Sequence, residues 1–276
     1  MKNFDNKTVL ITGGSSGIGL ALSKQFASKG ANVCILARRK SILEDAQKEI
    51  RKCCKSSSQN IVAISADVSN YDELKTALSK YIKENGGPDI LINSAGITYP
   101  GTFLDLNPKI FADNININYL GTVYSTKLIA PEMVKRGYGH IINISSLAAI
   151  VGIYGYSAYA PSKYAVRGFS RVLRAELKPF GVSVSIVYPP DTDTPQLAFE
   201  DKLKPEITRA ITHGGGLLSA DKVASIIIKG IQQDRFSIIP GLEGKLLVLF
   251  APIIGRVLYH YAVNKAKNAK KKKSSQ

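Results

Sequence analysis

A tyrosine and a lysine four residues apart can form an acid–base pair. Tyr159 and Lys163 belong to the segment Tyr-Ala-Pro-Ser-Lys, and positions i and i+4 share one face of a helix. The pKa of a free tyrosine is about 10, and a neighbouring ammonium group lowers it by stabilising the phenolate. Such a phenol can give a proton to a carbonyl oxygen while hydride reaches the carbonyl carbon. The pair therefore indicates chemistry on a ketone.

Two further polar residues accompany this pair. Ser146 lies thirteen residues before Tyr159, where its hydroxyl can hydrogen-bond the carbonyl of a substrate. Ser145 is its neighbour, and the spacing favours Ser146 without excluding Ser145. Asn118 falls inside a predicted helix, where an asparagine costs stability unless its side chain is used. We expect Asn118 to hold a water molecule that links Lys163 to solvent.

A glycine-rich segment near the N-terminus resembles a phosphate-binding loop. The predicted first strand ends at Thr12, and Gly13, Gly17 and Gly19 follow with the spacing G-x3-G-x-G. Glycines permit a tight turn and let the backbone approach a diphosphate closely. The next helix offers free N–H groups and the positive end of its dipole. Between a first strand and a first helix, this loop indicates a dinucleotide site.

The residues after the next strands are candidate contacts for the same dinucleotide. Arg38 and Arg39 follow the second strand, where proteins that prefer NAD carry an acidic residue. A basic residue there favours the 2′-phosphate of NADP(H), with Arg38 as the main contact. Asp67 and Val68 follow the third strand, where the adenine edge would lie. The fourth strand ends in Asn93-Ser-Ala-Gly96, and its last glycine permits close approach of the backbone.

Short apolar segments alternate with helical segments along most of the chain. Continuous apolar strands between helices are typical of parallel strands buried on both faces, and right-handed crossovers then give a doubly wound sheet. We therefore predict an α/β fold of the Rossmann type, with about seven parallel strands in a single domain over residues 5–241. The predicted strands are 8–12, 32–37, 61–67, 89–93, 140–145, 183–188 and 236–240. The predicted helices include 108–136, 158–177 and 221–233.

In their order along the chain, these motifs resemble those of the classical short-chain dehydrogenases/reductases. The resemblance covers about residues 5–240 and includes T-G-G-x-x-G-x-G, N-S-A-G, the helical asparagine and S-x12-Y-x3-K. It implies a nicotinamide-dependent oxidoreductase that forms homo-oligomers, in which Lys163 also binds the ribose hydroxyls. The implied catalytic residues are Asn118, Ser146, Tyr159 and Lys163. The candidate cofactor contacts are Gly13, Ser15, Ser16, Gly17, Ile18, Gly19, Arg38, Arg39, Asp67, Val68, Asn93, Ala95, Gly96, Tyr159, Lys163 and Thr194.

The loop after the sixth strand departs from the common pattern of this family. Pro189-Pro190 replaces the usual Pro-Gly and stiffens the loop beside the nicotinamide, from which Thr192 or Thr194 can reach the carboxamide. Segments 188–195 and 155–163 are similar to those of the 3-ketodihydrosphingosine reductase subfamily, which uses NADPH in sphingolipid synthesis. This similarity implies reduction of 3-ketodihydrosphingosine to sphinganine.

The segment 242–276 differs from the rest of the chain in hydropathy and charge. Residues 246–255 carry no charge, and residues 265–273 are rich in lysine. Ten apolar residues are too few to span about 30 Å of hydrocarbon. We expect an extension that lies in a membrane interface as a helix or a hairpin, with its lysines attracted to anionic lipid. The alternatives are a packing or oligomer helix and a solvated basic tail.

Composition argues against several other classes of protein. Three cysteines, two of them adjacent, and three scattered histidines predict neither a disulfide framework nor a metal site. Of the net charge of +16, +7 lies in residues 242–276, and no nucleic-acid-binding motif accompanies it, so we expect no nucleic acid as partner. The start of the chain has no apolar leader. We therefore expect a membrane-associated enzyme whose catalytic domain is cytosolic, at the endoplasmic reticulum in a eukaryote.

Two alternatives stay open for the function. Another membrane-facing short-chain reductase, acting on a long-chain 3-ketoacyl-CoA, a retinoid or a steroid, would carry the same motifs. A non-catalytic NADP-binding scaffold would have no need of the complete tetrad. The segment 196–219 is expected to form a variable substrate loop, in which Gly214, Gly215 and Gly216 would let a lid close. Its sequence does not name the substrate.

Overall fold

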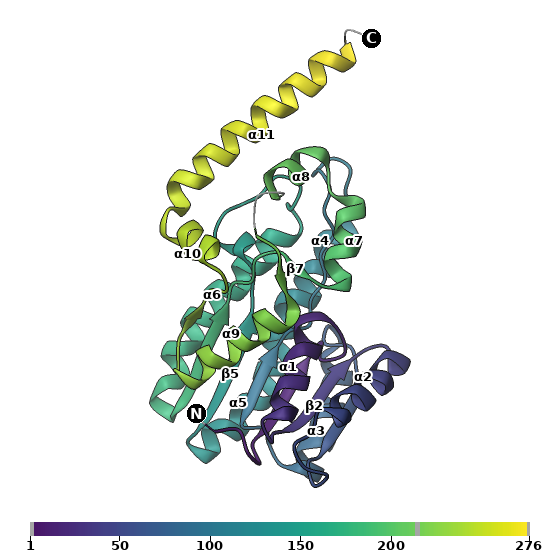
Figure 1. Ribbon diagram of the computed structural model, residues 1–276, viewed down its shortest axis with the longest axis vertical. Coiled ribbons are helices and arrows are strands. Elements are labelled where there is room, and N and C mark those ends of the chain that lie inside the picture. The colour runs from purple at the N-terminus through teal and green to yellow at the C-terminus, as the bar shows by residue number, and fades with distance from the viewer. Residues whose placement is uncertain (1–2, 213–215, 275–276) are drawn as a thin grey trace.

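The fold is a seven-stranded parallel sheet with helices on both faces (Figure 1). The computed structural model describes residues 3–212 and 216–274, with side chains described as far as Asn268. The strand order is β3-β2-β1-β4-β5-β6-β9, which confirms the predicted fold class. The strands are β1 Thr8–Thr12, β2 Asn32–Ala37, β3 Ile61–Ser65, β4 Ile90–Asn93, β5 Gly139–Ile144, β6 Val182–Val187 and β9 Ser237–Ile238.

The chain changes direction across the sheet between β3 and β4. Strands β1, β2 and β3 run outward to one edge, and the chain then returns to place β4 on the other side of β1. The register pairs Thr12 at the end of β1 with Leu36 in β2 and with Asn93 in β4. The loops after β1 and β4 therefore emerge side by side. In an open α/β sheet, a crevice forms at this point, outside the carboxyl ends of the strands.

Side chains of each central strand alternate between two hydrophobic cores. In β1, Val9 and Ile11 face one core and Leu10 faces the other, and all three are fully buried. Helices α1, α2 and α9 cover the first core, and α3, α5 and α6 cover the second. This double burial explains why the strands are continuous apolar runs. The bounds are α1 Gly17–Ser28, α2 Lys40–Lys52, α3 Tyr71–Asn85, α5 Gly121–Arg136, α6 Tyr159–Leu177 and α9 Ala220–Gln232.

The long helix predicted over 108–136 has three parts. Helix α4, Pro108–Asn114, leads into a π-helical turn over Ile115–Leu120, which continues as α5. The prediction of helix is confirmed, but the π turn at its middle was not expected. π turns inside α-helices occur frequently at functional sites. This one contains Asn118, which is fully buried.

The segment predicted as a variable loop is largely helical. Helices α7, Pro195–Leu203, and α8, Glu206–Thr212, occupy its first half. Strand β7, Thr192–Asp193, pairs in parallel with β8, Leu218–Ser219, and brings the two ends of this segment together. The predicted lid glycines Gly214 and Gly215 lie outside the described residues.

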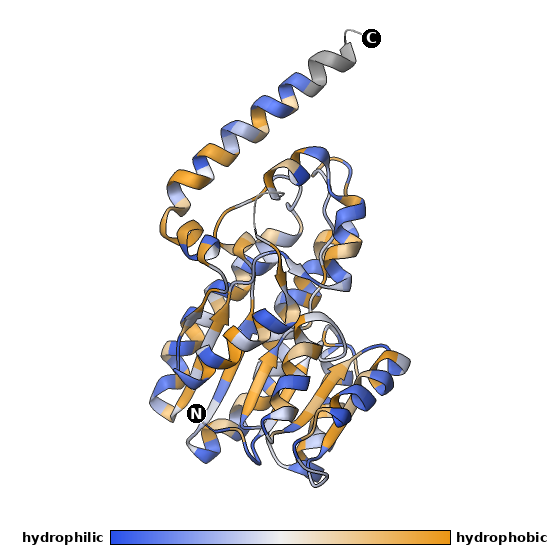
Figure 2. Cartoon of the chain, viewed as in Figure 1, coloured by the Kyte–Doolittle hydropathy of each residue, from blue (hydrophilic) through white to orange (hydrophobic). Residues whose placement is uncertain are grey.

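The C-terminal extension forms two helices. Helix α10, Leu242–Leu249, packs near the sheet, and α11, Ala251–Ser274, projects away from the body of the protein (Figure 1). Apolar residues dominate α10 and alternate with polar residues along α11 (Figure 2). Within the described residues, no single helix is long and apolar enough to cross a bilayer. The two helices meet that criterion only together, as a pair bent by 92°.

Candidate active site

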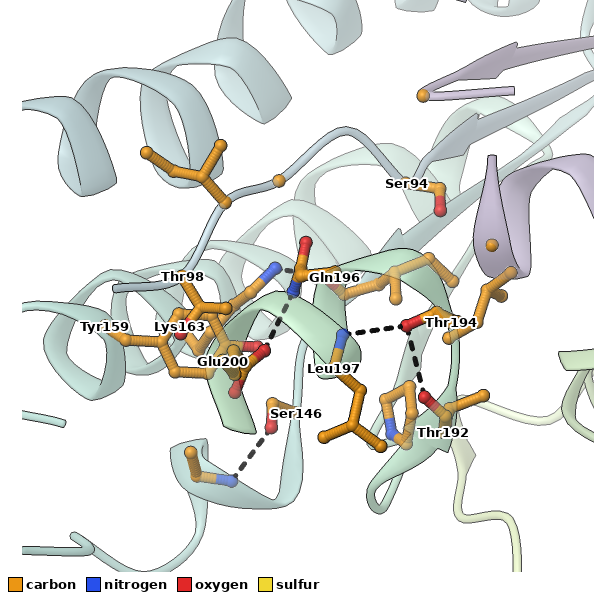
Figure 3. A pocket seen from close by; sticks show the side chains of 18 of the residues that line it. Ser94, Thr98, Ser146, Tyr159, Lys163, Thr192, Thr194, Gln196, Leu197 and Glu200 are labelled. Atoms are coloured by element: carbon orange, nitrogen blue, oxygen red, sulfur yellow. Dashed lines mark hydrogen bonds between the residues drawn. The ribbon is translucent and has the colours of Figure 1, made fainter. Parts of the chain in front are cut away.

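One large cavity lies at the carboxyl ends of the strands. Its volume is about 920 Å³, and its walls come from the loops after β1 to β6, from α7 and from the C-terminal extension. This is the place where open α/β sheets bind their ligands. Figure 3 shows the polar side chains that gather in it.

Three of the predicted catalytic residues meet in this cavity. Ser146 follows β5, and Tyr159 and Lys163 lie on successive turns at the start of α6. The Ser146 Oγ accepts a 3.1 Å hydrogen bond from the N–H of Ala148 and interacts with the Tyr159 phenol. The Lys163 Nζ lies 5.7 Å from the centre of the Tyr159 ring and donates a 3.0 Å hydrogen bond to the carbonyl of Ile144. The neighbouring Ser145 hydroxyl instead donates to the backbone carbonyl of Lys163.

The surroundings of Tyr159 favour its protonated form. Burial raises the pKa of the Tyr159 phenol, and the negative charge of Glu200 raises it further, while the hydrogen bond with Ser146 lowers it. The direction is opposite to the one expected from the Tyr-Lys spacing, because burial is the largest effect. Burial also lowers the pKa of Lys163 to about 8, so its ammonium form still predominates at pH 7. A protonated phenol beside a cation is suited to proton donation.

Asn118 holds a loop that forms part of the cavity wall. Its Oδ1 accepts a 2.7 Å hydrogen bond from the N–H of Ile97, and its Nδ2 donates to the Ile97 carbonyl at 2.9 Å and to Ser162 Oγ at 2.9 Å. Asn118 itself is outside the lining, whereas Ile97 belongs to it. The amide therefore holds the loop after β4, and the water molecule expected to link Lys163 to solvent stays a prediction.

The glycine-rich loop brings backbone N–H groups to the cavity. Ser16 precedes α1, and its side chain makes no capping hydrogen bond, so the first turn of the helix has no side-chain cap. Gly13 has φ +68°, and a Cβ there would lie 2.8 Å from the backbone of Ala95. Gly19 is outside the cavity lining and packs against the Gly13 carbonyl. A Cβ at position 19 would lie 2.2 Å from the Gly13 carbonyl oxygen, so only glycine fits there. The lining residues of this loop are Gly13, Ser15, Ser16, Gly17 and Ile18.

Two arginines provide positive charge beside this loop. Arg38 and Arg39 both line the cavity after β2, and the Arg38 guanidinium lies 3.4 Å from the Asp67 carboxylate. Burial alone would raise the pKa of Asp67, but hydrogen bonds from Ser69 and the charge of Arg38 hold it below its usual value. Val68 also lines this end of the cavity. An uncapped helix N-terminus and two arginines form a suitable donor set for a dinucleotide with an additional phosphate.

The residues after β4 divide between the cavity and the core. Ala95 and Gly96 line the cavity, and a Cβ at Gly96 would lie 3.4 Å from the Lys163 Nζ. Asn93 points away from the cavity into a buried polar network. It donates to Thr126 at 3.0 Å and to Asn143 at 2.8 Å. Its placement supports the sheet rather than direct contact with a ligand.

Comparison with known proteins assigns the family. Residues 7–203 match the family described as short chain dehydrogenase. The chain belongs to the short-chain dehydrogenase family. This confirms the resemblance and the oxidoreductase class inferred from the sequence motifs.

Several named relatives of this short-chain dehydrogenase are sphingolipid enzymes. It is 37% identical to a Danio rerio 3-dehydrosphinganine reductase, over 87% of this chain and 72% of the relative. It is 36% identical to a Dictyostelium discoideum 3-ketodihydrosphingosine reductase, over 89% of this chain and 78% of the relative. Among solved structures, a short-chain dehydrogenase from Sphingobium yanoikuyae in complex with NADPH matches with a TM-score of 0.76 and 27% identity, over 91% of this chain and 95% of that one.

The cavity of this dehydrogenase also contains Thr194, one of the predicted cofactor contacts, and residues that the sequence motifs did not indicate. Thr194 lies over the glycine loop, where its Cγ2 would be 3.0 Å from a Cβ at Gly17. Its hydroxyl accepts from the N–H of Leu197 and thereby caps α7. Tyr156 also lines the cavity, and its place only three residues before Tyr159 could have indicated this from the sequence. No local pattern distinguishes further lining residues such as Gln196, Glu200, Leu247, Ile254 and Leu258.

Proposed function

We propose that this short-chain dehydrogenase reduces 3-ketodihydrosphingosine to sphinganine with NADPH. The observation that carries the proposal is the make-up of the cavity. Tyr159 stands at its polar end, and Leu247, Ile254 and Leu258 of the C-terminal extension add an apolar wall. A long-chain amino ketone needs both environments in one site. The names of the relatives support the same substrate.

The catalytic residues have distinct roles in this reaction. Ser146 and Tyr159 donate hydrogen bonds that hold the ketone oxygen. When bound, the reduced nicotinamide supplies a hydride to the carbonyl carbon. Tyr159 gives its proton to the oxygen, so that the ketone becomes an alcohol, and the ammonium of Lys163 stabilises the phenolate that remains. The raised pKa of Tyr159 favours this direction, because the phenol stays protonated until the transfer.

The charges at the other end of the cavity favour NADPH over NADH. The 2′-phosphate distinguishes the two cofactors, and Arg38 and Arg39 are the cations placed after β2 to receive it. The ion pair between Arg38 and Asp67 does not oppose this role. Its 3.4 Å contact is partly exposed, and such pairs contribute at most about 1 kcal/mol.

The C-terminal extension fits a location at a membrane surface. In α11, Ile254 and Leu258 line the cavity, whereas Ile253 and Val257 are exposed by 65% and 61%. The helix therefore has an outward apolar face in addition to the one that it turns to the cavity. Immersion of this outer face in the lipid interface would bury it beside the source of a poorly soluble substrate. We place the catalytic domain on the cytosolic side, at the endoplasmic reticulum in a eukaryote.

The test is turnover of the proposed substrate by the full chain. Purified protein in detergent micelles with 3-ketodihydrosphingosine should oxidise NADPH, and NADH should support little turnover. Mass spectrometry should identify sphinganine as the product. Bound NADPH without turnover would contradict the substrate assignment, and long-chain 3-ketoacyl-CoA and retinoid ketones would then be the next substrates to test.

A further inference from the structure

A carboxylate that the reduction chemistry does not require lies in the wall of the cavity. Glu200, on α7, is only 9% exposed and lines the same cavity as the catalytic residues. Figure 3 shows it with Tyr159, Lys163 and Gln196 in the polar part of the site. Buried glutamates are uncommon unless they are paired or used, so this side chain needs an explanation.

Neutral side chains hold this carboxylate in place. The Tyr156 hydroxyl donates a 2.8 Å hydrogen bond to Glu200 Oε2, and Gln196 Nε2 donates to Oε1 at 3.4 Å. Among the side chains that the structure describes, no lysine, arginine or histidine forms an ion pair with Glu200. Lys204, one turn later on the chain, pairs instead with Asp191 at 3.5 Å and Asp201 at 2.7 Å.

An unpaired carboxylate in this position is costly for the protein. Burial raises the pKa of Glu200 to about 7, although the hydrogen bonds from Tyr156 and Gln196 and the charge of Lys204 act in the other direction. A cation placed beside the carboxylate would form the ion pair that Glu200 lacks within the described side chains. The cavity therefore has an electrostatic preference for a ligand that carries positive charge near Glu200.

Glu200 lies in the same part of the cavity as the reacting phenol, where an amino group next to a ketone would be bound. Glu200 is hydrogen-bonded to Tyr156, and the Tyr156 and Tyr159 rings lie 5.7 Å apart between their centres. The charge of Glu200 also acts directly on Tyr159. In 3-ketodihydrosphingosine, the carbon that carries the amine is bonded to the carbonyl carbon. A ketone oxygen on Tyr159 would therefore place the ammonium group in the same part of the cavity as Glu200.

We propose that Glu200 binds the protonated amino group of the substrate and so selects α-amino ketones over long-chain ketones that lack an amine. This inference rests on the proposed function, because it concerns recognition of the same substrate. It assigns to α7 a specificity role, with Tyr156 and Gln196 as positioning residues that orient the carboxylate.

The test compares two substrates and three forms of the full chain. The substrates are 3-ketodihydrosphingosine and its desamino analogue, and the proteins are the wild type, Glu200→Gln and the control Glu206→Gln. Glutamine keeps an oxygen for the Tyr156 hydroxyl but removes the charge. Glu206 is an exposed glutamate outside the cavity lining, so its variant controls for loss of one negative charge.

We expect Glu200→Gln to raise the KM for the amino ketone by about 30-fold or more, because truncation of one partner of a buried charge pair has an effect of that size. The KM for the desamino analogue should stay within about twofold, because this analogue has no ammonium group for the carboxylate to bind. Glu206→Gln should behave as wild type with both substrates. Equal losses on both substrates, or none on either, would overturn the inference, because a merely structural role of Glu200 does not distinguish an amine.

A measurement on the wild type keeps the inference testable if Glu200→Gln fails to fold. Acetylation of the substrate amine removes its charge, and the desamino analogue removes the amine itself. The wild type should prefer the free amine over both, by kcat/KM. Equal kcat/KM for all three ketones would overturn the role of Glu200 while leaving the reductase activity intact. Failure of the wild type to reduce any of them would instead contradict the proposed function.

Discussion

The side chain of Asn118 and the backbone of Ile97 form two reciprocal hydrogen bonds. The N–H of Ile97 donates to Oδ1 at 2.7 Å, and Nδ2 donates to its carbonyl at 2.9 Å. This pair ties the loop after β4 to the π turn that contains Asn118. Since Ile97 lines the cavity, the shape of the ligand site depends on a residue that does not touch the ligand space.

Replacement of this asparagine tests that dependence. Asn118→Leu keeps the volume but leaves the N–H and the carbonyl of Ile97 without these partners. We expect the free energy of unfolding to fall by about 2 kcal/mol or more, since each buried unsatisfied group costs about 1–3 kcal/mol. Urea denaturation measures the change, and NADPH titration by fluorescence should show weaker binding. An unchanged unfolding free energy would contradict the assigned role.

Tyr159→Phe removes the proton donor without changing the fold. We expect kcat to fall by about 10² to 10⁴, the usual contribution of a positioned general acid. Circular dichroism and NADPH binding should match those of the wild type. If this variant retained more than a few per cent of the wild-type turnover, Tyr159 would not be the donor.

Arg38→Ala should reduce the preference for NADPH. A hydrogen bond to a charged group contributes about 1.5–3 kcal/mol, so the KM for NADPH should rise about tenfold or more. The KM for NADH should change little, because NADH has no 2′-phosphate. Parallel kinetics with both cofactors measure the ratio, and Lys40→Ala serves as a control that removes an exposed charge outside the cavity lining. A proportional loss with both cofactors would contradict recognition of the 2′-phosphate.

The pH dependence of KM should depend on whether the substrate carries an amine. The pKa of Glu200 is about 7, so its carboxylate is charged above that pH and neutral below it. If it binds the ammonium group, the KM for the amino ketone rises as the pH falls below about 7. Burial and the charge of Asp191 raise this pKa, whereas Tyr156, Lys204 and Gln196 lower it. The desamino analogue should give a flat profile, and a rise for both ketones would assign the effect to another group.

Charges on the outer face of α11 should weaken membrane binding. Ile253→Asp combined with Val257→Asp places two carboxylates on the exposed apolar face, and co-flotation with vesicles that contain anionic lipid measures the result. We expect most of the protein to leave the vesicle fraction. Val172→Asp is the matched control, because Val172 is similarly exposed, at 58%, but lies on α6. Equal flotation of both proteins would contradict a membrane face on α11.

The central strands could be predicted because they are buried on both faces. In the run 8–12, Val9, Leu10 and Ile11 are fully buried and only the two terminal threonines are polar, and the glycines and polar residues that flank the run define its ends. The strand predicted over 236–240 is confirmed as the shorter β9, whereas the π turn was not predicted. Strand β9 is paired over only two residues, and the π turn depends on the contact between Asn118 and Ile97, which are distant in the sequence.

The candidate site could be predicted only where its residues belong to local motifs. Ser146, Tyr159 and Lys163 lie near one another along the chain, and the structure brings them together. The orientation of Asn93 could not be read from its place at the end of β4, because the neighbouring elements decide whether a terminal side chain meets the cavity or a buried network. Glu200 was missed for a similar reason, since only the packing of α7 places it beside the reacting phenol.

The C-terminal extension forms one wall of the candidate active-site cavity through Leu247, Ile254 and Leu258. A membrane anchor of the usual kind is modular, so an unrelated anchor can replace it without loss of activity. Here, a chimaera with a foreign anchor would restore residence at the bilayer but would leave one side of the cavity open. On the proposed membrane location, the same two helices would therefore determine both location and turnover, and neither could be exchanged without the other.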